Sequence, residues 1–246
     1  MADVAGKIDI GRVLTNTFGV ISRNPVVFLG LSLLIVGLPN AAMQLIQGSP
    51  DAIAGAFASP TVIITSIVGF FVFLFLSVVL QATLIVATLN DLGSKEINLG
   101  ACISQAIHKF LPLFGLGLLF GLGIALGFML LIVPGVILYL MWIVAAPVMM
   151  AEDKGIIESF KRSAELTSGS KGMIFLLMII FVVVAAVIGG IGGALSFFSV
   201  TASVIIATIV NTITGALQGA GIASIYVDLR TVKEGTDSST LADVFA

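Results

Sequence analysis

Few side chains in this sequence could carry out chemistry. Cys102 is the only cysteine and His108 the only histidine, which excludes an internal disulfide, a cysteine-based metal cluster and any pair of catalytic histidines. No HExxH motif, GxGD motif or Ser–His pair is present, and His108 falls on the polar face of a predicted helix. A general base needs a positioned partner, so we expect a protein that is not an enzyme and binds no cofactor or metal ion.

Four uncharged polar residues stand out because they fall inside long apolar stretches: Gln81, Asn211, Thr214 and Gln218. The last three are spaced i, i+3, i+7 and therefore share one helix face. Amides surrounded by lipid form hydrogen bonds between helices that are worth roughly 0.6–2 kcal/mol. These residues either hold neighbouring helices together or give a polar lining to a cavity for a lipid head group or a small solute.

The composition excludes an ordinary soluble domain. Apolar residues make up 59% of the chain and charged residues 10%, and the mean hydropathy is +1.21. A soluble domain carries about 25% charged residues. The net charge of −2 gives no basic excess, so we expect no nucleic acid as a partner. The expected surroundings are a phospholipid bilayer, in which another membrane protein could also bind.

Three charge-poor stretches cover most of the chain. Residues 24–90 hold one charge, Asp51, and residues 110–151 and 172–227 hold none. Each stretch is long enough for two spanning helices of about 20 residues. We predict spans at residues 25–46, 61–89, 111–132, 135–151, 172–195 and 202–227, with turns near 47–51, Pro134-Gly135 and 196–201.

The basic residues predict the orientation of these spans. All 11 Lys and Arg residues fall on one side of the predicted spans, and the three turns between paired helices carry none. By the positive-inside rule, both termini are cytoplasmic. The sequence therefore predicts a multi-pass protein of the bacterial inner (plasma) membrane. No cleavable signal peptide is evident, since the first apolar run begins only at residue 25.

A repeated unit organises the chain. An amphipathic segment precedes each pair of spans, and residues 8–11 (IDIG) match residues 97–100 (INLG). Residues 80–92 and 217–229 likewise share Leu-Gln, nine residues, and Asp-Leu. We predict an all-α polytopic membrane protein with six transmembrane helices in three parallel-repeat hairpins, each preceded by an amphipathic interfacial helix. The repeats (8–92, 97–154, 156–230) form one pseudo-threefold bundle within a single domain, 1–232, and 233–246 is a polar, flexible tail.

Three carboxylates, Asp91, Asp153 and Asp228, follow the predicted even-numbered spans. A helix dipole disfavours negative charge at a C-terminus, so each carboxylate needs a basic partner. Three arginines on the same side of the membrane are candidates: Arg12, Arg162 and Arg230. We predict that such ion pairs clamp the interfacial helices to the ends of the spans.

Glycine and proline predict how the spans pack. The GxxxG pairs in the spans are Gly117/Gly121, Gly123/Gly127, Gly189/Gly193 and Gly215/Gly219. This spacing lets helix backbones approach closely, and we interpret it as packing within the bundle. Pro147 removes one helix hydrogen bond and is predicted to bend the fourth span.

Residues 131–167 carry a resemblance to a known family. The run LIVPGVILY (131–139) is followed by Trp142, APV (146–148), EDKG (152–155) and ESFKRSAELT (158–167), and residues 226–230 (YVDLR) continue the pattern. This pattern resembles the glycerophosphoryl diester phosphodiesterase membrane-domain superfamily and the related YciC-like (UPF0259-type) bacterial inner-membrane proteins. The resemblance implies a membrane module and not the phosphodiesterase itself. Members often carry an Arg at or before the position of Met141 or Trp142, and this chain has none there.

Two classes of function fit the sequence, and a third is weaker. The first is a non-enzymatic inner-membrane protein that organises the membrane or binds a partner and could contact phospholipid. The second is a transporter or flippase for a lipid or small amphipathic solute, which would use Gln81 and the face of Asn211 and Gln218. The third is an accessory subunit of an envelope complex. The sequence itself names no ligand, partner or oligomeric state.

Overall fold

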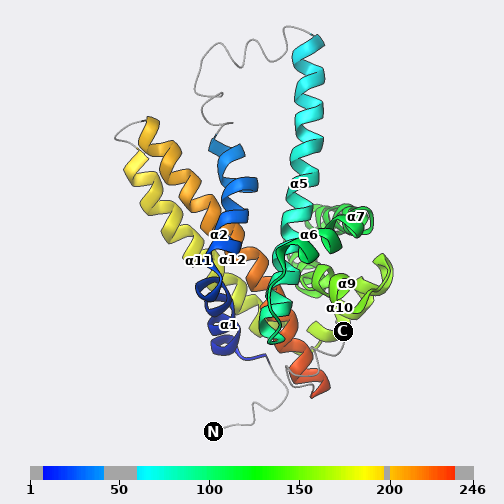
Figure 1. The fold of residues 1–246 in the computed structure, drawn as a ribbon. Coiled ribbons are helices and arrows are strands. Elements are labelled where there is room, and N and C mark those ends of the chain that lie inside the picture. The colour runs from blue at the N-terminus through cyan, green and yellow to red at the C-terminus, as the bar shows by residue number, and fades with distance from the viewer. Residues whose placement is uncertain (1–7, 42–59, 197–199, 236–246) are drawn as a thin grey trace.

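The computed structural model describes residues 8–41, 60–196 and 200–235, which are helical apart from short connections. Figure 1 shows the helices in chain order. They are α1 (Ile10–Arg23), α2 (Pro25–Ser32), the π-helix η1 (Leu33–Gly37), α5 (Pro60–Leu92), α6 (Leu99–His108), α7 (Phe110–Leu130), α8 (Ile132–Trp142), α9 (Ala145–Glu152), α10 (Ile156–Thr167), α11 (Lys171–Ser196) and α12 (Val200–Glu234). No strand occurs in these described ranges, so the all-α class predicted from the sequence is confirmed for them.

Four helical segments are long and apolar enough to cross a membrane: Ile67–Leu92, Phe110–Leu130, Ile132–Glu152 and Ala202–Glu234. Two further pairs of helices qualify only if each bent pair counts as one span. The break between α1 and Pro25–Ala41 bends the chain by 89°, and the break between α10 and Lys171–Val187 bends it by 97°. The described chain therefore has four to six candidate spans, and it is compatible with an integral membrane protein.

The amphipathic segments are separate helices with defined starts. The side chain of Asp9 accepts a hydrogen bond from the Arg12 backbone N–H at the start of α1, and Asn98 accepts one from Ala101 at the start of α6. Such caps satisfy one of the free N–H groups of a first turn. α1 ends before Pro25, because a residue that precedes proline is disfavoured in the helical region. The cap pattern therefore repeats, as do the sequences around Asp9 and Asn98.

The turn between α7 and α8 lies earlier than the sequence predicts. α7 ends at Leu130, Leu131 is extended, and α8 begins at Ile132, so the prediction of a turn at Pro134-Gly135 is wrong. Pro134 instead occupies the first turn of α8, where its missing N–H costs no helix hydrogen bond. Gly135 lies at the crossing with α7: a Cβ on Gly127 would come within 2.9 Å of the Gly135 Cα.

The helix before Pro147 is interrupted. α8 ends at Trp142, and α9 begins at Ala145 after Ile143 and Val144. Proline cannot donate to the carbonyl four residues earlier, which here belongs to Ile143. The break therefore falls where the missing hydrogen bond would have closed the turn.

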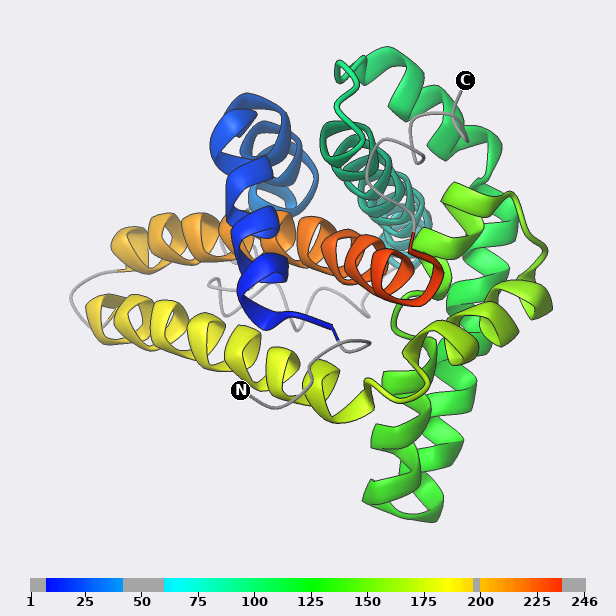
Figure 2. The same ribbon diagram turned by 90° about the horizontal axis from the view of Figure 1, so that it is seen from below.

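The core lies where the C-terminal halves of α5 and α12 pack together with α9. Leu84 and Tyr226 are fully buried there, and a Cβ on Gly219 would come within 2.7 Å of the Leu84 Cβ. Seen from below, the α7–α8 hairpin points away from the α11–α12 pair, while α5 runs along the line of view (Figure 2). The α7–α8 hairpin and the α11–α12 pair thus diverge from a shared base, although the two helices within each pair lie side by side.

The predicted tail (233–246) begins too early, and the predicted repeats are not tested. α12 continues to Glu234, so Lys233 and Glu234 belong to a helix and not to the predicted tail. The rest of that tail from residue 236, the turn near 47–51 and residues 197–199 lie outside the described residues. The three repeats and the single domain remain predictions.

Candidate functional site

Asp228 holds the start of α1. Its side chain is fully buried in α12, and its Oδ2 accepts a hydrogen bond of 2.8 Å from the backbone N–H of Asp9. The Arg12 Nε donates to the other oxygen, Oδ1. This hydrogen bond raises the pKa of the Arg12 guanidinium, against the opposing effect of its partial burial. One buried carboxylate thus binds both the cap and the first turn of α1.

Asp91 holds the other end of the same helix. The Asn24 Nδ2 donates to its Oδ1 at 2.8 Å, and the Arg23 Nε donates to its Oδ2 at 3.2 Å. The hydrogen bond to Asp91 raises the pKa of Arg23. α1 has 14 residues, and its two ends are therefore separated by roughly 20 Å at about 1.5 Å per residue. Asp228 of α12 therefore holds the start of α1 and Asp91 of α5 holds its end, at the lower end of the molecule in Figure 1.

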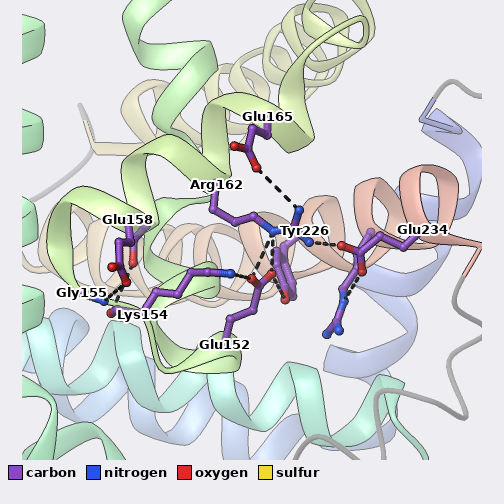
Figure 3. A network of polar contacts seen from close by, with 10 residues as sticks. Glu152, Lys154, Gly155, Glu158, Arg162, Glu165, Tyr226 and Glu234 are labelled. Atoms are coloured by element: carbon purple, nitrogen blue, oxygen red, sulfur yellow. Dashed lines mark hydrogen bonds and ion pairs between the residues drawn. The ribbon is translucent and has the colours of Figure 1, made fainter.

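A third group of charges joins α9, α10 and α12 (Figure 3). The Glu152 Oε2 accepts a hydrogen bond of 3.1 Å from the Arg162 Nε, and its Oε1 accepts one of 3.1 Å from the Tyr226 hydroxyl. Glu152 also pairs with Lys154. The neighbouring helices α9 and α10 thus meet the distant α12 at this one carboxylate.

Glu234 extends this group along α12. It forms ion pairs with Arg162 and, at 2.8 Å, with the Nε of Arg230. The Nη1 of Arg230 is buried and has no hydrogen-bond partner among the described residues. We name Glu152, Arg162, Tyr226, Arg230 and Glu234 the polar cluster.

Asp153 behaves differently from the other two aspartates. It adopts a left-handed conformation (φ 52°) at the end of α9 and forms an ion pair with Lys109, just after α6. Burial lowers the pKa of the Lys109 ammonium despite that pair, because the Asp153 side chain is 87% exposed and solvent screens its charge.

The pairs differ in part from those that the sequence suggested. Of the candidate residues, Arg12 and Asp228 lie together, whereas Arg162 and Arg230 meet at Glu234. Asp228 does not lie at a helix C-terminus, because α12 continues beyond it to Glu234, so the argument from the helix dipole is wrong for Asp228.

Sequence reasoning missed Lys154 and Tyr226, which bind Glu152, and five partners at helix boundaries: Arg23, Asn24, Lys109, Glu152 and Glu234. The signal of these five is their position, since each lies at or next to a helix boundary. In the described part of the chain, no three His, Cys, Asp or Glu side chains are grouped as a metal site would require.

The four uncharged polar residues of the spans do not share one cavity. Thr214 and Gln218 line a cavity of about 230 Å³ between α8, α11 and α12. Gln81 lines a second cavity of about 220 Å³, to which α5, α7, α8, α9 and α12 contribute residues, Trp142 of α8 among them. Ile143 and Ile222 line both cavities. Asn211 lines neither of these two.

The comparisons with known proteins give one match. Residues 59–218 match the Uncharacterised protein family (UPF0259). The chain belongs to this family. No curated protein and no solved structure matches it significantly.

The region matched by UPF0259 includes part of each feature described above. It contains Gln81 and Gln218 from the two cavities, and the pair of Glu152 with Arg162. Asp228 and the helix α1 lie beyond it. The match identifies UPF0259 and does not extend to the phosphodiesterase membrane-domain superfamily.

Proposed function

We propose that this UPF0259 protein is a non-enzymatic, six-span protein of the bacterial inner membrane that organises the membrane or binds a protein partner, and that it contacts phospholipid. The observation that carries the proposal is the sharp bend between each of two amphipathic helices and the apolar helix that follows. α1 and α10 turn by 89° and 97° into the next helix. If the apolar helices cross the bilayer, the amphipathic ones lie along its surface.

Exposed apolar side chains support contact with lipid. α1, α6 and α10 each bury one face, yet each also exposes a large apolar residue: Phe18, Ile107 and Ile157. Basic residues occur on or directly after the same helices, as in helices that bind at the interface of anionic membranes. These helices would therefore anchor the cytoplasmic face of the protein to phospholipid.

The ion pairs support six crossings. Arg23 binds Asp91, so α1 and the end of α5 are on the same side of the membrane. If α5 crosses, the chain between Arg23 and α5 must also cross. Tyr226 binds Glu152 in the same way, so the chain between α9 and α12 must cross if α12 does. The two bent pairs then supply the fifth and sixth spans, and both termini share the cytoplasmic side with the basic residues.

A transporter or flippase is the alternative, and the glutamines favour it. Gln81 and Gln218 each precede a clamping aspartate, Asp91 or Asp228, by ten residues. This places the amides about 15 Å along the helix from the charged end, which is near the middle of a hydrocarbon layer about 30 Å thick. Polar groups at that depth are used by proteins that move solutes across membranes.

Two measurements on the purified full-length protein separate the two functions. Native mass spectrometry from a mild detergent should show bound phospholipid, together with any protein partner that co-purifies. In liposomes with a dye-labelled phospholipid, the protein should leave the dithionite-protected fraction of the dye at the level of empty liposomes. Complete bleaching of the dye would instead support the flippase, and a spectrum without phospholipid would contradict the proposed lipid contact.

A further inference from the structure

The cavity between α8, α11 and α12 has one apolar and one polar wall. We name it the α8–α11–α12 pocket. α11 supplies the apolar wall through Met178, Phe181, Val182 and Ala185. α8 and α12 supply three hydrogen-bonding side chains: Tyr139, Thr214 and Gln218. Gln218 is exposed, so the pocket opens on the outer side of the helices.

The three polar side chains make no hydrogen bond with any described residue. For Thr214 this differs from other threonines of α12. Thr208, Thr212 and Thr231 each donate to the backbone carbonyl four residues earlier, whereas Thr214 does not. In hydrocarbon, an unsatisfied hydroxyl or amide costs several kcal/mol. A molecule that brings hydrogen-bonding atoms to this wall would recover that cost.

The ligand that fits this pocket is neutral. No charged residue lines the pocket, and Asp228, the clamping carboxylate of α12, lies ten residues and about 15 Å along the helix from Gln218. A phosphate or carboxylate would therefore lose its hydration without meeting a counter-charge.

The size of the pocket limits what it can hold. Its volume of about 230 Å³ is below the roughly 300–1,000 Å³ of a site that encloses a whole ligand. Only the head of a lipid would be enclosed, and its chain would extend through the open side into the bilayer.

We propose that the α8–α11–α12 pocket binds the head of a neutral membrane lipid, through carbonyl or hydroxyl oxygens that pair with Tyr139, Thr214 and Gln218. Isoprenoid quinones and long-chain alcohols both present this chemistry. The proposal does not depend on the function proposed above, because phospholipid contact at the charged end and a neutral ligand in the pocket can each be present without the other.

Trp142 provides the readout. It is the only tryptophan of the chain, it lines the neighbouring cavity that contains Gln81, and it precedes Ile143, which lines both cavities. We would titrate the full-length protein in nanodiscs with decyl-benzoquinone and follow the quenching of tryptophan fluorescence. The wild-type protein should show saturable quenching, and the double variant Thr214→Val/Gln218→Leu should bind at least tenfold more weakly, since a tenfold change corresponds to about 1.4 kcal/mol.

Two further variants test whether the ligand binds in this pocket. Ala185→Phe fills part of the pocket from its apolar wall without removing a polar group, and it should weaken quenching as well. Gln81→Leu removes the amide of the other cavity, which Trp142 also lines, and therefore tests whether the quencher binds there instead; it should leave the titration unchanged. Non-saturable quenching, or equal weakening by Gln81→Leu, would overturn the assignment of the site.

Competition identifies the chemistry of the ligand. Hexadecanol or 2-hexadecanone, which lack the quenching quinone ring, should displace decyl-benzoquinone and restore the fluorescence, and the stronger competitor shows whether hydroxyl or carbonyl oxygens are preferred. Displacement by neither would overturn the proposal. Equal displacement by phosphatidylglycerol would also overturn it, because the pocket would then accept a charged head group.

Discussion

At the scale of single residues, the position of a carboxylate decides how much it stabilises the protein. Asp228 is fully buried and receives two hydrogen bonds from α1, whereas Asp153 is largely exposed and forms one ion pair. Both are aspartates near the end of a predicted span, and the sequence treats them alike. Burial separates them, because a buried carboxylate that loses its partners cannot regain them from water.

Asp228→Asn tests this difference. The amide keeps the shape of the side chain but loses the charge that Arg12 and the Asp9 N–H bind, so we expect a loss of about 1.5–3 kcal/mol in the free energy of unfolding. Unfolding in detergent by urea or heat measures it. The control is Asp153→Asn, for which we expect a change within about 0.5 kcal/mol. If the two variants lowered the free energy of unfolding equally, the contacts of Asp228 with α1 would not stabilise the protein more than an exposed ion pair does.

Cys102 gives a second prediction at this scale. It is buried in α6, burial raises the pKa of its thiol, and its sulfur lies 3.6 Å from the Asn90 Nδ2. A raised pKa means a smaller thiolate fraction at any given pH, and the thiolate is the reactive form. At pH 8, we expect Cys102 to react with a maleimide at least about tenfold more slowly in the native protein than in SDS.

Ser104→Cys in a Cys102→Ser background provides the comparison for this rate. Ser104 is exposed on the same helix, so its replacement should react rapidly in the native protein. Fast labelling of Cys102 itself in native protein would show that α6 does not pack against α5 as described.

At the scale of elements, helix faces are predictable from sequence and helix ends are less so. The stripe of α1 (Ile10, Val13, Leu14, Thr17, Phe18, Ile21) is evident from residue spacing. Its members Val13 and Thr17 are buried, whereas Phe18 is exposed. The end of α7 is not evident, because Pro134 looks like a turn residue but fits equally well in the first turn of a helix. What decides is the contact of Gly127 with Gly135, which depends on how two helices cross.

The glycines of α7 test that crossing. Gly127 lies against Gly135, while a Cβ on Gly121 would meet nothing within 4 Å. We expect Gly127→Leu to destabilise the protein by about 1–3 kcal/mol through overpacking, whereas Gly121→Leu should not destabilise it. Thermal unfolding in the same detergent compares the two variants. If Gly121→Leu proves the more damaging, an unseen partner covers that face and α7 packs differently from the fold described.

At the scale of the whole molecule, composition predicts the membrane and the helical class, but not which helix ends meet. The charge-poor stretches predict the apolar helices directly, because a spanning helix is recognised from its length and hydropathy alone. The pairs of Arg23 with Asp91 and of Arg162 with Glu152 join segments 68 and 10 residues apart. Such pairing follows from the spatial order of the helices, which a single sequence does not reveal.

These pairs also predict how many times the chain crosses the membrane. In a Cys102→Ser background, we would place single cysteines at positions 49 and 199, taken from the predicted turns, and at Leu131 between α7 and α8. Ser168 and Ser104, both exposed near the charged helices, provide the opposite side. With six spans, an impermeant maleimide should label positions 49, 131 and 199 in intact bacteria and positions 104 and 168 only after lysis.

A four-span protein would give a different pattern. If the bent pairs do not cross, position 199 lies on the same side as Ser168, and both are labelled together. The end of α12 would then lie across the membrane from Glu152, and the hydrogen bond between Tyr226 and Glu152 could not form. Tyr226→Phe supplies an independent check: it should lower stability by about 1 kcal/mol if the bond exists and leave it unchanged if the two residues lie on opposite sides.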